Sequence, residues 1–189
     1  MSCPPIKLGK ENESKLNLTI YSIVEVLDPI FYKLQFTSND VTTFSIIFCY
    51  LSYINLKKKN LSSITYYLIY VILDYLDGYM ARKYNMASDF GDMYDHVRDV
   101  SFNMLLFSVI YKNIYLSSLF VIGVLLSLIS IGCQEVQFEN KCEDTYNNTL
   151  SILKNYCVKS KLFDILEKYT GNGTTYVFTV MAMYGFCTS

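Results

Sequence analysis

The sequence is poor in charge, proline, glycine and histidine, and these shortages exclude several classes of protein. Charged residues make up 17% of the chain and hydrophobic residues 52%, whereas a typical soluble protein has about 25% charged residues. So much apolar surface excludes a disordered chain. Three prolines and eight glycines exclude collagen-like and low-complexity proteins. The net charge of -1 argues against a nucleic-acid binder, which usually carries a basic excess. The 189 residues are enough for one domain of ordinary size.

The six cysteines form no CxxC pair and show no paired spacing, and the chain has a single histidine. A zinc site or a secreted disulfide framework is therefore not expected. We predict instead that most of these cysteines pack as small apolar side chains. They are Cys3, Cys49, Cys133, Cys142, Cys157 and Cys187.

Long stretches without charge suggest helices that cross a membrane. Residues 61–73 and 113–134 contain no charged residue, and residues 41–56 are also uncharged. A helix needs about 20 apolar residues to cross a bilayer. The sequence therefore predicts an all-α fold, a polytopic membrane helix bundle of five or six transmembrane helices. The expected spans are residues 41–56, 61–81, 92–111, 114–133 and 174–187, with a sixth left open near an amphipathic stretch at 150–168.

The first part of the chain differs from the rest in composition. Residues 20–36 mix apolar and charged residues around Pro29, which is typical of an amphipathic segment at the membrane interface. Residues 37–40 form a Thr-Ser-Asn-Asp cluster that predicts the start of the first span, because such residues cap helix N-termini. We therefore divide the chain into an N-terminal cytosolic or interfacial segment, residues 1–40, and a transmembrane domain, residues 41–189.

Basic residues set the expected orientation. With the N-terminus in the cytosol, eleven of the 16 Lys and Arg residues fall on the cytosolic side and four on the opposite side, while Arg98 lies inside the third span. Cytosolic loops of membrane proteins carry the excess of basic residues. We therefore expect a multi-pass protein with a cytosolic N-terminus, although Lys57–Lys59 count against it. In a eukaryotic cell the expected membrane is the endoplasmic reticulum.

Four aspartates lie inside the predicted spans, where ionisable groups are costly and mark functional sites by default. Asp74 and Asp77 are three residues apart near the end of the second span, and Asp95 and Asp99 are four apart near the start of the third. Each pair occupies one face of its helix, and the short connection places both pairs at the same end of two antiparallel helices. Converging carboxylates repel unless they bind protons or cations. We therefore predict a site for Mg²⁺ or Mn²⁺, with two ions expected.

Small residues and one arginine flank the carboxylates. Gly78 and Ala81 lie on or beside the face of the first pair, and Gly91 lies four residues before Asp95, so each leaves room for a ligand. Arg82 could hold a phosphate. Equally, it could be an ordinary basic anchor at the cytosolic end of a span.

Together these residues resemble the signature of the CDP-alcohol phosphatidyltransferase family. The pattern Asp74-x2-Asp77-Gly78-x2-Ala81-Arg82-x8-Gly91-x3-Asp95-x3-Asp99 matches that signature at every fixed position. The resemblance implies an integral membrane enzyme of mostly six helices, a homodimer, with a polar active-site cavity open to the cytosol. It also implies that two divalent metals bind the diphosphate of a CDP-linked donor. An acceptor hydroxyl would attack the phosphorus distal to cytidine and release CMP.

The resemblance also implies a role for each residue of the pattern. By position, Asp74, Asp77 and Asp95 would be metal ligands, and Asp99 a ligand or the general base. Gly78, Ala81 and Gly91 would line the pocket for the cytidine diphosphate group, with Arg82 nearby. The segment Asn39-x-Val41-Thr42 is similar to the start of the family's first helix.

The resemblance leaves the donor and the acceptor open. The sequence Asp95-His96-x2-Asp99 resembles the choline and ethanolamine phosphotransferases, in which the CDP group sits on the small alcohol and the acceptor is diacylglycerol. The short chain and residues 89–91 are more similar to enzymes that use CDP-diacylglycerol, which we favour. His96 is then a candidate for contact with the acceptor, a second candidate base, or a histidine at the rim of the cavity.

Two other classes of function remain under consideration. Residues 134–172 are more polar than the family's fifth helix, which keeps open a non-catalytic membrane protein of the same fold that binds nucleotide or lipid. A cation channel or transporter would explain the carboxylates but not the small residues beside them, so it ranks last.

Overall fold

The described part of the chain is all-helical. The computed structural model describes residues 5–6, 10–139, 149–157, 165 and 168–189, and within these ranges it contains no strand. Its α-helices are α1 (Lys15–Lys33), α2 (Ser38–Lys57), α3 (Ser62–Lys83), α4 (Asp89–Ile110), α5 (Ile114–Glu139) and α7 (Thr174–Thr188). Two 3₁₀ helices, η1 (Thr149–Tyr156) and η2 (Gly171–Gly173), lie between α5 and α7.

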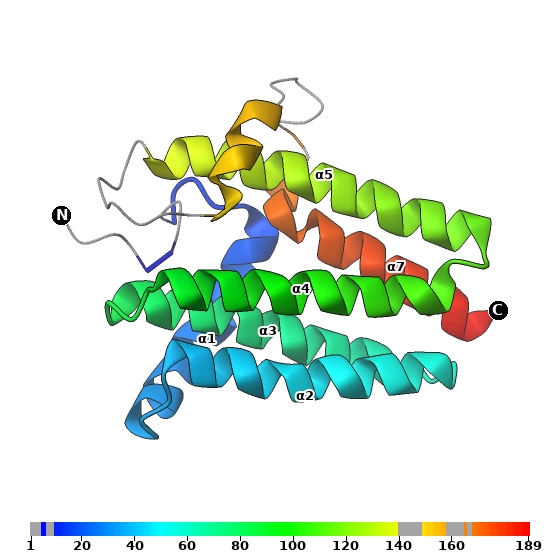
Figure 1. Cartoon of the computed structure of the whole chain (residues 1–189), viewed down its shortest axis with the longest axis horizontal. Helices are drawn as coiled ribbons and strands as arrows, with labels where there is room; N and C mark the ends of the chain where they lie inside the picture. The colour runs from blue at the N-terminus through cyan, green and yellow to red at the C-terminus, as the bar shows by residue number, and fades with distance from the viewer. Residues whose placement is uncertain (1–4, 7–9, 140–148, 158–164, 166–167) are drawn as a thin grey trace.

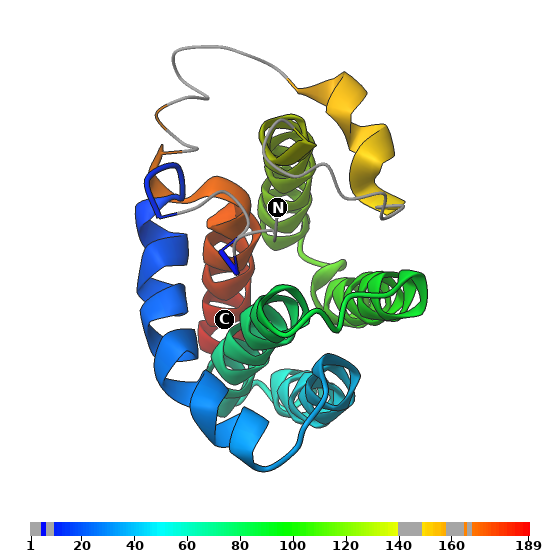
Figure 2. The same ribbon diagram turned by 90° about the vertical axis from the view of Figure 1, so that its left-hand side faces the viewer.

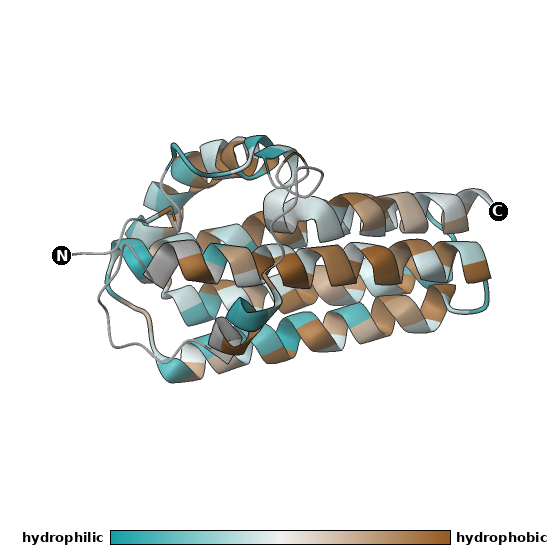
Figure 3. Ribbon diagram, turned by 90° about the horizontal axis from the view of Figure 1, so that it is seen from above, coloured by the Kyte–Doolittle hydropathy of each residue, from teal (hydrophilic) through white to brown (hydrophobic). Residues whose placement is uncertain are grey.

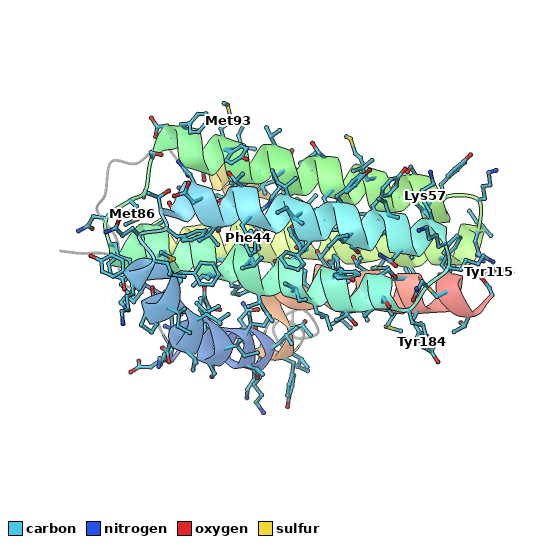
Figure 4. All side chains as sticks on the ribbon, turned by 90° about the horizontal axis from the view of Figure 1, so that it is seen from below. Phe44, Lys57, Met86, Met93, Tyr115 and Tyr184 are labelled. Atoms are coloured by element: carbon cyan, nitrogen blue, oxygen red, sulfur yellow. A yellow bond between two sulfur atoms is a disulfide. The ribbon has the colours of Figure 1, made fainter. Side chains whose placement is uncertain are left out.

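The helices form an elongated bundle (Figure 1) in which α2 to α5 and α7 run along the long axis and α1 crosses one side. Seen end-on (Figure 2), α3 lies between α1, α2 and α7. Met86 and Met93 lie at one end of the bundle, whereas Lys57, Tyr115 and Tyr184 lie at the other (Figure 4). We call the end marked by Met86 and Met93 the site end. Consecutive helices from α2 to α5 therefore alternate in direction, as the predicted spans require.

The predicted spans coincide with the helices of the structure to within a few residues. The cap of α2 is confirmed in detail: Thr37 Oγ1 accepts a hydrogen bond from the Asp40 amide at 3.2 Å, and Asp40 Oδ2 accepts one from the Thr37 amide at 2.8 Å. This reciprocal arrangement satisfies two amides that have no partner within the helix. The stretch expected at the interface lies mostly in α1, which contains Pro29.

A single described helix, at Ile114–Gln134 within α5, is long and apolar enough to pass as a membrane span. The prediction of five or six spans is therefore not confirmed by length and composition. Charged residues lower the apolar character of α3 and α4, and α7 has only 15 residues. Within the stretch 150–168, residues 150–156 lie in η1, and residues 157, 165 and 168 are also described. The other residues of the stretch lie outside the described part of the chain, and so does the question of a sixth span.

The interior is apolar, and so is much of the surface. The apolar residues that are at most 1% exposed come from five helices: Val24, Val41, Leu56, Leu76, Met80, Leu106, Ile110, Ala182 and Met183. Yet α2, α3, α4, α5 and α7 each also present large apolar side chains outward, and apolar residues recur along their length in Figure 3. Ile47, Leu68, Met104, Leu125 and Met181, one from each of these helices, are between 47% and 67% exposed.

An ion pair joins α1 to the end of α3. Lys83 Nζ donates to Asp28 Oδ2, and the Tyr84 hydroxyl donates to the same oxygen at 3.1 Å. The Asp28 side chain is fully buried, so a cation beside it is needed to offset the cost of burying its charge. The hydrogen bond to Asp28 raises the pKa of Lys83 above its ordinary value.

One disulfide corrects the prediction made for the cysteines. Cys133, near the end of α5, is bonded to Cys157, which follows η1. The spacing of the cysteines along the sequence did not reveal this pair, because the two residues meet only when η1 packs on α5. Cys49 is buried as predicted and Cys187 is partly exposed. Cys3 and Cys142 lie outside the described residues.

Candidate active site

The four predicted aspartates meet between α3 and α4, close to α2. One carboxylate oxygen from each of Asp74, Asp95 and Asp99 lies within 4.8 Å of the others. Asp77 stands beside this group and accepts a hydrogen bond from Thr42 of α2 at 2.7 Å. The convergence expected from the spacing of the two pairs is therefore present, with α2 closing the side of Asp77.

A tight connection between α3 and α4 brings the two pairs together. Asn85 adopts a left-handed conformation with φ of 54°, and the Met86 amide donates to the Ala81 carbonyl at 2.8 Å. Ser88 then caps α4 by accepting a hydrogen bond from the Gly91 amide at 3.1 Å. The chain thus reverses within a few residues, which makes α3 and α4 antiparallel neighbours.

Arg98 of α4 lies at the centre of the carboxylates. Its Nη2 contacts Asp74, lies 2.5 Å from Asp95 Oδ1 and donates to Asp99 Oδ1 at 2.6 Å. Its Nη1 donates to Asp77 Oδ2 and to the Ser45 hydroxyl of α2, both at 3.0 Å. The Arg98 side chain is only 2% exposed. One guanidinium therefore contacts all four aspartates of the predicted site.

Two tyrosines donate hydrogen bonds to the aspartates of the site. The Tyr70 hydroxyl of α3 donates to Asp99 Oδ1 at 2.8 Å, and the Tyr176 hydroxyl of α7 donates to Asp74 Oδ2 at 3.3 Å. The Tyr70 ring also lies 5.3 Å from the Arg98 guanidinium, within the range of a cation–π contact. The last helix of the chain therefore contributes a side chain to the carboxylate cluster.

The space beside Gly78 and Gly91 and the guanidinium of Arg82 face residues outside the carboxylate cluster. A Cβ added at Gly78 would lie 3.3 Å from Arg82 Nη1, and one added at Gly91 would lie 2.9 Å from Asn39 Oδ1. Both positions therefore permit a close approach of a polar side chain. Arg82 Nε donates to the Pro5 carbonyl at 2.8 Å, so its guanidinium contacts the N-terminal segment. Ala81 is partly buried.

His96 lies beside an earlier turn of its own helix. Its Nδ1 is 2.5 Å from the carbonyl oxygen of Asp92 and 3.6 Å from an Asp92 carboxylate oxygen. The side chain is 27% exposed. These contacts orient the imidazole along α4, and a role for His96 with the acceptor or as a base remains a prediction.

The oxygen set fits a divalent cation. Asp74, Asp95 and Asp99 offer three carboxylate oxygens in one small volume, and hard cations such as Mg²⁺ and Mn²⁺ prefer oxygen ligands. Asp95 Oδ1 is buried and makes no hydrogen bond, and the Arg98 guanidinium is its neighbour at 2.5 Å. A metal ion bound to this oxygen would therefore share it with Arg98.

Sequence reasoning found the aspartates but missed the residues that hold them. Arg98, Tyr70, Tyr176 and Ser45 were not predicted as part of the site. Arg98 could have been found, because a charged residue inside an apolar helix needs a partner of opposite charge, and Asp95 lies three residues before it. Tyr70 and Tyr176 left no comparable signal in a chain that contains 18 tyrosines.

Comparisons with known proteins agree with the motif. The model of the CDP-alcohol phosphatidyltransferase family matches residues 36–186. A curated relative is the CDP-diacylglycerol–glycerol-3-phosphate 3-phosphatidyltransferase of Mycoplasma genitalium, 34% identical over 76 residues. That match covers 40% of this chain and 32% of the relative, so the chain spans about a third of the relative's length. No solved structure matches the chain.

Proposed function

Because the chain belongs to the CDP-alcohol phosphatidyltransferase family, we propose that it transfers a substituted phosphate group from a CDP-linked donor to a hydroxyl acceptor and releases CMP. The observation that carries this proposal is the meeting of Asp74, Asp77, Asp95 and Asp99 around one point of the bundle. The four aspartates of the signature are thus both intact and folded into one group.

The chemistry assigned to these residues is phosphoryl transfer. A divalent cation held by Asp74, Asp95 and Asp99, with Asp77 beside them, would neutralise the charge of the donor's diphosphate. The acceptor oxygen forms a bond to the phosphorus distal to cytidine, and the bond from that phosphorus to the oxygen of CMP breaks. Such reactions depend mainly on positioning and on electrostatic stabilisation of the transferred group.

Asp99 is the proposed base. Arg98 and Tyr70 both contact Asp99 Oδ1, and among the described residues none donates a hydrogen bond to Asp99 Oδ2. The side chain is 32% exposed, so an acceptor hydroxyl can reach it. Oδ2 can therefore take the proton of the acceptor as its oxygen attacks, while Oδ1 stays fixed.

We propose CDP-diacylglycerol as the donor and a small hydroxyl compound as the acceptor. The relative's name supports glycerol 3-phosphate as the first acceptor to test. Arg82, at the end of α3 beside Gly78, is the proposed contact for a phosphate, together with Gly78, Ala81 and Gly91 as small residues around it. His96 favours the second candidate, in which CDP-choline or CDP-ethanolamine reacts with diacylglycerol.

We further propose a multi-pass membrane protein in which α2 to α5 and α7 all cross the bilayer. Large apolar side chains point outward from each of these helices, and only 28% of the span in α5 is buried by the rest of the bundle. Apolar surface on this scale needs a cover, which acyl chains supply. Residues 1–40 would form the interfacial segment and residues 41–189 the transmembrane domain, with the site end in the cytosol and two chains forming a dimer.

The test is CMP release from the purified protein in detergent with Mg²⁺ or Mn²⁺. We expect turnover with CDP-diacylglycerol, and the alcohol that supports it, tested across an acceptor panel, identifies the product. Turnover only with CDP-choline or CDP-ethanolamine plus diacylglycerol would replace the first candidate by the second. If no pair of donor and acceptor releases CMP with either metal, the enzymatic proposal is contradicted, and a non-catalytic protein of the same fold is favoured.

A further inference from the structure

Arg98 lies among the aspartates to which the family resemblance assigns metal ions. Its place there needs an explanation. The guanidinium contacts the three carboxylates that could hold a cation, and it also contacts Asp77. We propose that Arg98 is a built-in cation that holds the four aspartates together before a divalent ion binds, and that it competes with that ion for them. This inference rests on the proposed function, because it needs the metal site.

The carboxylates need a positive charge among them. Four carboxylates packed this closely carry a charge of about -4 when ionised, and repulsion between them is strong where water is scarce. The Arg98 side chain is 2% exposed, so it interacts with the carboxylates without much screening by solvent. A guanidinium stays protonated in proteins, so its positive charge is permanent. Arg98 therefore offsets about one of the four negative charges at all times.

The geometry of the guanidinium suits this function. Nη1 of Arg98 contacts Asp77, whereas Nη2 contacts Asp74, Asp95 and Asp99. The planar fork of a guanidinium pairs with carboxylates through donors on separate nitrogens, whereas the ammonium of lysine is a single compact charge without that fork. The Ser45 hydroxyl and the Tyr70 ring fix this fork from α2 and α3. The side chain is thus held in place from three helices.

The contacts of Arg98 overlap with those that a metal ion needs. The atom of Arg98 that approaches Asp74, Asp95 and Asp99 is Nη2, and those residues are the ones whose carboxylates each have an oxygen within 4.8 Å of the others. A cation bound to this group and Nη2 would both draw on the same three carboxylates. Binding of a divalent ion therefore has to weaken the Arg98 contacts, and Arg98 lowers the affinity of the site.

The experiment compares the whole purified chain with Arg98→Met in detergent, and Mn²⁺ is the probe. Mn²⁺ affinity is measured by electron paramagnetic resonance of the free ion, and thermal stability is measured without metal and with Mn²⁺. We expect the variant to bind Mn²⁺ at least about tenfold more tightly than wild type, because the positive charge of Arg98 no longer repels the ion. Its metal-free melting temperature should fall by about 10 °C, because the aspartates lose their partner. Mn²⁺ should restore most of that loss.

Two further variants make the result specific. Lys112→Met removes an exposed positive charge beyond the far end of α4. It should change neither the Mn²⁺ affinity nor the metal-free melting temperature. Arg98→Lys keeps the charge without the fork, so its Mn²⁺ affinity and its metal-free stability should fall between wild type and Arg98→Met. Arg98→Lys also serves as the test if Arg98→Met does not fold without metal.

The outcomes separate this inference from the proposed function. Unchanged or weaker Mn²⁺ binding by the Arg98 variants, or an unchanged metal-free melting temperature, would overturn the role of Arg98. In that case Asp95→Asn would still bind Mn²⁺ more weakly than wild type, and the metal site would stand. If Asp95→Asn bound Mn²⁺ as wild type does, the metal site of the proposed function would be wrong, and the inference with it.

Discussion

At the scale of single residues, the site consists of four carboxylates and the groups that orient them. Arg98 supplies a positive charge between the aspartates. Hydroxyl donors come from three other helices, through Thr42, Tyr70 and Tyr176. Hydrogen bonds to charged groups each contribute about 1.5–3 kcal/mol. The donors therefore decide which oxygen of each aspartate faces a ligand.

Tyr70→Phe tests this orientation at Asp99. The change removes the hydroxyl that donates to Asp99 Oδ1 at 2.8 Å and keeps the ring. We expect CMP release to fall about tenfold, because Asp99 loses one of the two groups that fix Oδ1. Tyr115→Phe, on an 82% exposed tyrosine, is the control and should retain full activity. Equal activity of both variants would show that Tyr70 does not orient the base.

At the scale of elements, the cap of α2 links the stability of the bundle to pH. Hydrogen bonds from the Thr37 hydroxyl and the Thr37 amide lower the pKa of Asp40. A carboxyl whose pKa is lowered by folding stabilises the protein above its unfolded value of about 3.9, and that contribution is lost as the pH falls through the lower folded value.

Thr37→Ala should therefore destabilise the protein at neutral pH by about 1 kcal/mol, the usual effect of removing an N-cap. The difference from wild type should shrink as the pH falls from about 4 through the lowered pKa of Asp40, because Asp40 becomes protonated in both proteins only at the end of this range. Melting temperatures measured across this range provide the check. A difference that stays constant with pH would mean that the Thr37 hydroxyl does not stabilise the ionised Asp40.

The disulfide is a second feature at this scale, because it joins the end of α5 to η1. It closes a loop with a sequence separation of 24, and a cross-link over such a loop stabilises a protein by about 3 kcal/mol. Cys133→Ser should therefore lower the melting temperature of the purified oxidised protein by about 10 °C. Cys187→Ser, at a free cysteine, is the matched control. A reducing agent should destabilise the control but not Cys133→Ser, and the opposite pattern would contradict the role of the bond.

The elements were largely predictable because their signals are local. Charge-free runs located α2, α3 and α5, and the residues 37–40 marked the start of α2. The spacing of the aspartates predicted their convergence, since spacing fixes the face of a helix. The Cys133–Cys157 bond and the contact of Tyr176 with Asp74 depend on how distant segments return to the bundle. No local pattern encodes such contacts.

At the scale of the whole molecule, the proposed topology places the two ends of the bundle on opposite sides of a membrane. Ala87 is exposed next to Met86 at the site end, and Lys58 is exposed next to Lys57 at the other end (Figure 4). The basic residues favour the cytosol for the site end. The two positions therefore report on opposite compartments.

Ala87→Cys and Lys58→Cys test this topology with a membrane-impermeant maleimide on sealed vesicles whose cytosolic face points inward. We expect Lys58→Cys, on the side away from the cytosol, to be labelled before permeabilisation. Ala87→Cys should be labelled only after permeabilisation, and the unmodified chain gives the background of the native cysteines. The reverse pattern would contradict the orientation and would place the disulfide in an oxidising compartment, where such bonds persist.

The central claim is that the converging aspartates perform the transfer, and Asp99 tests it most directly. CMP release should be compared between wild type, Asp99→Asn and Asp89→Asn, the last being an exposed carboxylate in the first turn of the same helix. We predict a loss of at least about 100-fold for Asp99→Asn, because the amide cannot take the proton of the acceptor, and little change for Asp89→Asn. Unchanged activity of a folded Asp99→Asn protein would contradict the account.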